Sequence, residues 1–217
     1  MSELHEYIKG KNAAFVGMAP NIMGKGLGDE INSFDLVFRT NIFPIPEEYK
    51  VDYGSKCDVI SMLKSSAINP DVFSKGGIQW VIHYRPAAKY SPLINYYRMT
   101  IDERNKIRIK IYKEIGFDPK HGTAGINIIA TVLKSEPKRL KLFGITGYQD
   151  KNGNVVDYFK GTQHYIPYFR SKIRPGIVSM KHHPSHNFQV QNDWIRYLLK
   201  NGRVEMDPYS LEYFKYN

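Results

Sequence analysis

Short apolar runs separated by polar stretches set the pattern of this chain. Each run is about four to six residues long, which suits a strand that is buried on both faces of a sheet. The runs that predict strands are residues 12–17, 35–38, 57–62, 78–83 and 140–145.

Longer segments after these runs predict helices. In residues 101–115, Ile107, Ile111 and Ile115 recur at four-residue intervals and share one helix face. Residues 122–133 form a second, more apolar helical segment, and residues 188–200 a third. The alternation predicts an α/β fold, namely a single Rossmann-like domain over residues 1–217 with a mostly parallel sheet flanked by helices.

Composition excludes several classes of protein. The 217 residues are 42% hydrophobic, which is enough to build a core. Cys57 is the only cysteine, so an intrachain disulfide and a Cys-rich zinc module are excluded. No apolar run has the length of a membrane span, and residues 1–6 lack the features of a signal peptide. We expect a soluble, cytoplasmic protein with no membrane partner.

Positive charge is in excess and unevenly distributed. The formal net charge is +10, and residues 158–192 contain five Lys or Arg but no Asp or Glu. Aromatic residues are interleaved with these cations. Such a stretch suits an anionic ligand, and it also suits the backbone and bases of a nucleic acid.

Two glycine-containing turns are candidate phosphate sites. One follows the first predicted strand and includes Gly17, Gly24, Gly26 and Gly28, but its spacing matches neither a dinucleotide fingerprint nor a P-loop. The other, Thr123-Ala124-Gly125, opens a predicted helix, whose free amides attract anions. A plain tight turn and an ordinary N-cap are the alternatives for the two segments.

Histidines are the candidate proton-transfer groups. His164, His182, His183 and His186 all lie in the acid-free stretch, and imidazole is suited to proton transfer near neutral pH. No carboxylate or cysteine lies nearby to complete a metal site with His182, His183 and His186, and the chain contains no Asp-x-Asp. We therefore expect no metal.

In their order along the chain, these segments resemble the sialyltransferases of glycosyltransferase family 29. The residues that carry the resemblance to the family's long motif are Val16, Gly17, Asn21, Gly24, Gly26, Gly28, Ile31, Asp35, Val37, Arg39 and Asn41. Residues 52–56, Asp-Tyr-Gly-Ser-Lys, resemble the family's Asp-Val-Gly-Ser-Lys, and residues 123–125 its short motif. His164-Tyr165 resembles the third motif, and His186 with Gln191 the last one. Two departures are Met18, where the family usually has Asn, and Gln191, where it has Glu.

The resemblance implies a GT-A-like variant of the α/β fold and an inverting, metal-independent glycosyltransferase. It implies a nucleotide-sugar donor as co-substrate, no cofactor, His186 as the general base and His164 as the group that assists the departing phosphate. His183 is the rival base. The residues implied to line the substrate pocket are Gly17, Asn21, Gly24, Asn41, Thr123, Ala124, Gly125 and Tyr165.

Three functions stay open at this point. In the first two, the protein is a glycosyltransferase whose acceptor is either a saccharide or a hydroxylated base in DNA. A DNA acceptor would explain the basic charge and the interleaved aromatic residues. The third is a non-catalytic basic module that binds nucleic acid, since a fold does not fix a function.

Overall fold

The computed structural model describes residues 2–41, 43–62, 70–84, 92–119, 122–152 and 187–215. Its centre is a seven-stranded sheet with the order β5-β4-β3-β2-β1-β6-β7, in which every adjacent pair is parallel. The strands are β1 (Asn12–Val16), β2 (Leu36–Thr40), β3 (Val59–Met62), β4 (Trp80–His83), β5 (Asn95–Arg98), β6 (Arg139–Phe143) and β7 (Glu205–Met206). The predicted α/β class with a parallel sheet is confirmed.

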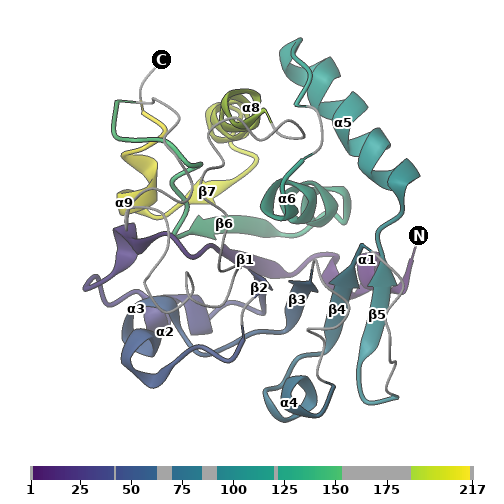
Figure 1. Ribbon diagram of the computed structural model, residues 1–217, viewed down its shortest axis with the longest axis vertical. Coiled ribbons are helices and arrows are strands. Elements are labelled where there is room, and N and C mark those ends of the chain that lie inside the picture. The colour runs from purple at the N-terminus through teal and green to yellow at the C-terminus, as the bar shows by residue number, and fades with distance from the viewer. Residues whose placement is uncertain are drawn as a thin grey trace, which may run out of the picture.

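Helices cover both faces of this sheet (Figure 1). The longer ones are α5 (Ile101–Ile115), α6 (Ala124–Lys134) and α8 (Phe188–Lys200), which correspond to the three predicted helical segments. The shorter helical elements are α1 (Glu3–Ile8), η1 (Pro20–Ile22), α2 (Gly28–Asn32), η2 (Glu47–Tyr49), α3 (Lys50–Tyr53), α4 (Pro70–Lys75) and α9 (Pro208–Leu211). No helix in the described part of the chain has the length and hydrophobicity needed to cross a bilayer.

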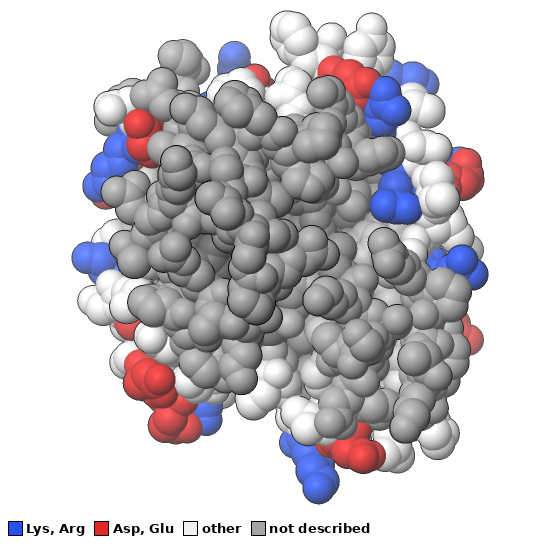
Figure 2. Space-filling model, viewed as in Figure 1, with Lys and Arg blue, Asp and Glu red and all other residues white. Residues whose placement is uncertain are grey.

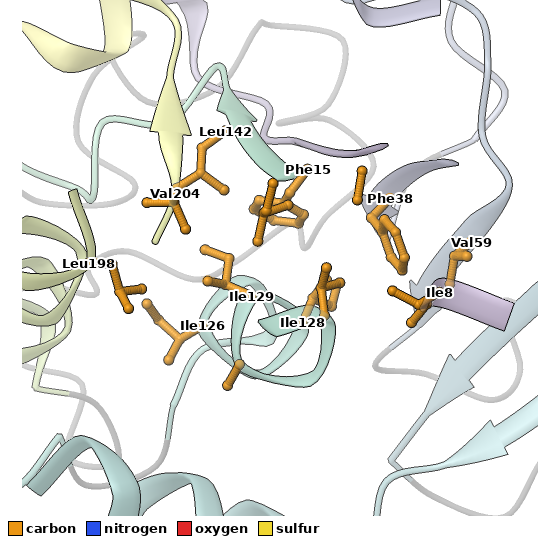
Figure 3. Packing of buried hydrophobic residues seen from close by; sticks show 14 of the residues in the cluster. Ile8, Phe15, Phe38, Val59, Ile126, Ile128, Ile129, Leu142, Leu198 and Val204 are labelled. Atoms are coloured by element: carbon orange, nitrogen blue, oxygen red, sulfur yellow. The ribbon is translucent and has the colours of Figure 1, made fainter. Parts of the chain in front are cut away.

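The two faces of β1 show how the sequence builds two apolar layers. Successive side chains of a strand point to opposite faces, so Ala13 and Phe15 join the cluster under α6 and α8. Ala14 and Val16 join the cluster on the opposite face, which includes residues of α2 and α3. In Figure 3, isoleucines of α6 lie between β1 and β6 on one side and Leu198 of α8 on the other. This packing fixes where α6 begins relative to the sheet.

The chain order creates a switch point between β1 and β6. From β1 the chain builds outward through β2, β3, β4 and β5, and then crosses back to add β6 on the other side of β1. In an open parallel sheet, the carboxyl ends of the two strands at such a point border a crevice in which ligands bind. The segments after Val16 and Phe143 are therefore the first place to look for a site.

Candidate functional site at the carboxyl edge of the sheet

Gly17 and Gly144 lie at the switch point, where the backbone after β1 contacts the backbone after β6. The Gly17 amide donates to Phe143 O over 2.8 Å, and the Ala19 amide donates to Gly144 O over 3.0 Å. A Cβ at position 17 would overlap the Gly144 carbonyl, so only glycine permits this approach of the two strand ends. The structure gives Gly17 this packing role; its predicted contact with a ligand stays a prediction.

The N-terminus of α6 lies beside the same strand end. Thr123 is the N-cap, and its Oγ1 accepts from the Ile126 amide at 3.4 Å. Gly125 faces Phe15 of β1 so closely that a Cβ there would lie 3.2 Å from the ring Cζ. In the described part of the chain, the amides of Ala124 and Gly125 have no hydrogen-bond acceptor. Within the described residues, two first-turn donors of α6 thus lack an acceptor next to β1.

Gln191 connects α8 to this helix start. Its Oε1 accepts from the Thr123 amide at 3.1 Å, and the residue is buried. At the position where the family motif has Glu, this chain therefore places a neutral amide at the positive end of the α6 dipole. Sequence reasoning missed this contact, because 68 positions separate the two residues and no periodic pattern links them.

The glycine-rich turn after β1 is held by a carboxylate of the chain itself. Asp52 accepts from the amides of Gly24, Lys25 and Gly26 at 2.7, 2.8 and 2.8 Å. Three converging amides are a favourable site for an anion, and here that anion is the Asp52 side chain. The amide of Gly24 is thus bonded within the chain, and the ligand contact predicted for this residue stays a prediction.

Other residues of the long motif also bind to backbone. Arg39 is buried, and its guanidinium donates to the carbonyls of Lys56, Tyr53 and Gly54. Burial lowers the pKa of Arg39 to about 10. Asp35 accepts from the Asn12 amide at 2.8 Å. Arg39 thus holds the loop that follows α3, and Asp35, just before β2, is linked to the start of β1.

Asn21 and Asn41 occupy the loops after β1 and β2. The Asn21 amide group lies 2.9 Å from Ser210 Oγ, and Ser210 Oγ accepts from the Ile145 amide at 3.0 Å. With its amide oxygen toward Ser210, Asn21 also donates to Ala19 O over 3.2 Å. Asn41 has a positive φ of 61°, and its amide donates to Ser61 O over 2.7 Å. Their predicted ligand contacts stay predictions.

Asp207 binds the backbone that follows β6 at the switch point. Its Oδ2 accepts from the Gly144 amide at 3.0 Å, while its Oδ1 accepts from the Tyr209 and Ser210 amides and so caps α9. Burial raises the pKa of this carboxyl above its usual range, against the opposing effect of those hydrogen bonds. The buried Asp207 side chain thus links the Gly144 turn to the start of α9.

The structure does not describe the predicted proton-transfer groups. His164, Tyr165, His183 and His186 lie outside the described residues. Of the predicted substrate residues, the structure brings Gly17, Thr123, Ala124 and Gly125 to one strand end. Among the described residues, no group of three or more His, Cys, Asp or Glu is placed to hold a metal ion.

Comparison with known proteins identifies a relationship in part of the chain. Residues 7–95 match the sequence model of the family described as glycosyltransferase family 29 (sialyltransferase). Alpha-2,8-sialyltransferase 8E of Homo sapiens is 38% identical over 65 residues, which are 30% of this chain and 16% of that protein. The Mus musculus protein of the same name is 42% identical over 59 residues, 27% of this chain and 14% of the relative. These alignments thus span about a sixth of the relatives' length.

Solved structures share the fold over a larger part of the chain than the family match covers. One is a mammalian sialyltransferase crystal structure, with a TM-score of 0.54 and 16% identity over 91% of this chain and 69% of the other. Another is a mammalian sialyltransferase in complex with Gal-beta-1-3GalNAc-ortho-nitrophenol, with a TM-score of 0.54 and 15% identity over 94% and 71% of the two chains. The shared fold covers nearly the whole chain, while the family match covers the predicted long motif and residues 52–56.

Proposed function

We propose that this sialyltransferase-like chain is a glycosyltransferase that moves a sugar from a nucleotide-sugar donor to a hydroxyl group of a saccharide. The family match over residues 7–95 and the sialyltransferase fold support a nucleotide-sugar glycosyltransferase. That the transferred sugar is sialic acid is a further part of the proposal. It rests on alignments that cover only a small share of the curated relatives' length.

The observation that carries the proposal is the open helix start at the switch point. The amides of Ala124 and Gly125 are free of acceptors within the described chain and lie next to the end of β1. A helix N-terminus with open amides stabilises negative charge through hydrogen bonds and the helix dipole. The donor phosphate is the anion that we assign to it.

The proposed chemistry is a single inverting displacement. The acceptor oxygen attacks the anomeric carbon and forms the new glycosidic bond, while the bond to the donor phosphate breaks and the electron pair leaves with the phosphate. His186 takes the acceptor proton, and His164 donates a hydrogen bond to the departing phosphate. Both roles come from the family resemblance, and neither step in the proposal uses a metal or a cofactor.

A saccharide acceptor is preferred over DNA. One structure that shares the fold is described as a complex with a Gal-beta-1-3GalNAc derivative, and this supports a saccharide acceptor for the present chain. The family match, the curated relatives and the solved structures described above add no support for a DNA acceptor or for a non-catalytic nucleic-acid module. The cytoplasmic location expected from the sequence stays a prediction.

The test is a transfer assay with a panel of cytidine, uridine and guanosine nucleotide sugars and β-galactoside acceptors. We expect one donor class to release its nucleotide in an acceptor-dependent way, with chelator present. His186→Ala should lose transfer but keep donor binding, measured as a ligand-dependent rise in Tm. The proposal is wrong if no donor raises the Tm and none is turned over.

A further inference from the structure

The peptide group that joins Gly122 to Thr123, directly before the first turn of α6, is hydrogen-bonded at both of its polar ends. Its carbonyl oxygen, Gly122 O, accepts from Asn127 Nδ2 at 3.2 Å, and its N–H, the Thr123 amide, donates to Gln191 Oε1 over 3.1 Å. This peptide bond is trans, so its carbonyl and its N–H point in opposite directions. Asn127 and Gln191 therefore hold the peptide group from its two sides.

Both of these carboxamide side chains are buried. Asn127 is 3% exposed and Gln191 is 2% exposed, and they belong to α6 and α8, which pack against the same face of the sheet (Figure 1). A hydrogen bond is stronger in such surroundings than in water, and a buried polar group that loses its partner is costly. The two bonds therefore fix the plane of the peptide group before α6.

Asn127 is itself held in place by its neighbours. A Cβ at position 122 would lie 2.9 Å from Asn127 Oδ1, so glycine leaves the room that the carboxamide occupies. Ser61 Oγ of β3 donates to the Tyr84 hydroxyl over 3.2 Å. Burial raises the pKa of Tyr84, against the opposing effect of hydrogen bonds from Ser61 and Asn127. Asn127 thus connects the ends of β3 and β4 to the start of α6.

The bonded peptide group determines how the chain enters α6. The Thr123 carbonyl accepts from the Asn127 amide at 3.0 Å, which is the first hydrogen bond of the helix. The Thr123 amide is already bonded, while the amides of Ala124 and Gly125 have no acceptor within the described residues. A change in the plane of the preceding peptide group would therefore alter the direction of these two donors.

The groups that hold this peptide are uncharged. The first turn of α6 contains no Asp or Glu, whereas the first turn of α5 contains Asp102 and Glu103. A carboxylate at a helix start competes with a bound anion, but a carboxamide supplies a donor and an acceptor without charge. In the view of Figure 2, described Lys and Arg side chains are interspersed with Asp and Glu along the edge, so these charges form no one-signed field that would replace the α6 amides.

We propose that Asn127 is a positioning residue of the phosphate site, because together with Gln191 it keeps the amides of Ala124 and Gly125 aimed at the donor phosphate. This inference rests on the proposed function, which assigns the donor phosphate to the start of α6. In this role Asn127 acts through the backbone and does not touch the phosphate. Donors that are oriented in advance need no reorganisation when the anion binds, so their loss of orientation weakens binding.

Inorganic phosphate is the probe, followed by nuclear magnetic resonance of the full chain at the amides of Ala124 and Gly125. The parent chain should show saturable shifts at both amides. Asn127→Ala and Asn127→Leu, of which the second keeps much of the side-chain volume, should each weaken phosphate binding about 10-fold, which corresponds to about one hydrogen bond to a charged group. Gly122→Ala keeps every buried side chain but displaces the Asn127 carboxamide, and it should weaken binding at least about 3-fold.

Asn192 offers a matched control. It is 2% exposed, and its Nδ2 donates to Gly147 O over 2.8 Å, so Asn192→Ala and Asn192→Leu remove the same kind of bond elsewhere in the fold. In urea unfolding, these variants should lose about as much stability as the variants of Asn127. Their phosphate binding, however, should stay within about 2-fold of the parent chain.

The possible failures separate this inference from the proposed function. If the folded variants at positions 122 and 127 bind phosphate as the parent does, or if the Asn192 variants lose as much, the phosphate site stands but the positioning role is wrong. If phosphate shifts neither amide in the parent chain, the assigned phosphate site fails and the positioning role fails with it. Circular dichroism identifies the variants that are folded.

Discussion

The contact between Asp52 and the glycine-rich turn makes the sharpest prediction about stability. Asp52→Ala removes the acceptor of three amides, those of Gly24, Lys25 and Gly26, at 2.7–2.8 Å. Hydrogen bonds to a charged acceptor contribute about 1.5–3 kcal/mol each when they cannot be replaced. Residues 24–26 are exposed, so water takes over part of this role.

With that discount, we expect a loss of about 2–4 kcal/mol in the free energy of unfolding. For a chain of this size, this corresponds to a fall in Tm of about 4–16 °C. Urea unfolding followed by circular dichroism measures the free energy, and differential scanning calorimetry measures the Tm. Asp71→Ala, which removes an exposed carboxylate at the start of α4, should change stability by less than about 0.5 kcal/mol.

A second measurement separates the lost anion from other effects of the substitution. Inorganic phosphate at millimolar concentration should raise the Tm of Asp52→Ala more than that of the parent chain, because the three amides then lack their own acceptor. If Asp52→Ala is as stable as Asp71→Ala, and phosphate has the same effect on both, the carboxylate does not hold the turn and the reasoning is refuted.

Three further predictions concern other parts of the fold. Asp207→Ala should cost about 2–5 kcal/mol in urea unfolding, because the buried amides of Gly144 and Ser210 lose their acceptor; a cost below about 0.5 kcal/mol would contradict this. Gln191→Glu should keep the bond to Thr123 but raise the donor KM about 5-fold by adding negative charge at the start of α6. An unchanged KM would count against the phosphate site. Burial, followed by the charge of Lys134, lowers the pKa of His5 from 6.5, so its contribution to stability is complete above pH 6.5 and is lost as the pH falls below it. The urea midpoint should fall less steeply between pH 7 and 5.5 in His5→Asn, and identical slopes would refute the assignment.

The central strands could be predicted because burial on both faces leaves continuous apolar runs in the sequence. β5 escaped prediction because Asn95-Tyr96-Tyr97-Arg98 is a partly exposed edge strand without such a run. β7 has only two residues, too few for a pattern. The predicted helices matched α5, α6 and α8, whose periodicity or capping residues are local signals.

The candidate site was predictable only where its signal is local. Thr123 was identified because a small polar residue before an apolar helix is an N-cap signature, and the structure confirms the cap. The bonds from Asp52 to the turn span 26–28 positions, and the bond from Gln191 to Thr123 spans 68. Such contacts depend on how the elements pack, and no spacing rule in the sequence encodes them.

The most direct test of the account is an amide titration by nuclear magnetic resonance with the donor identified in the transfer assay. We predict saturable shifts at the amides of Ala124 and Gly125, which are free of acceptors within the described chain, and smaller ones at Gly24 and Gly26, which Asp52 already binds. If the donor leaves both α6 amides unchanged, or shifts only the glycine-rich turn, the start of α6 is not the phosphate site.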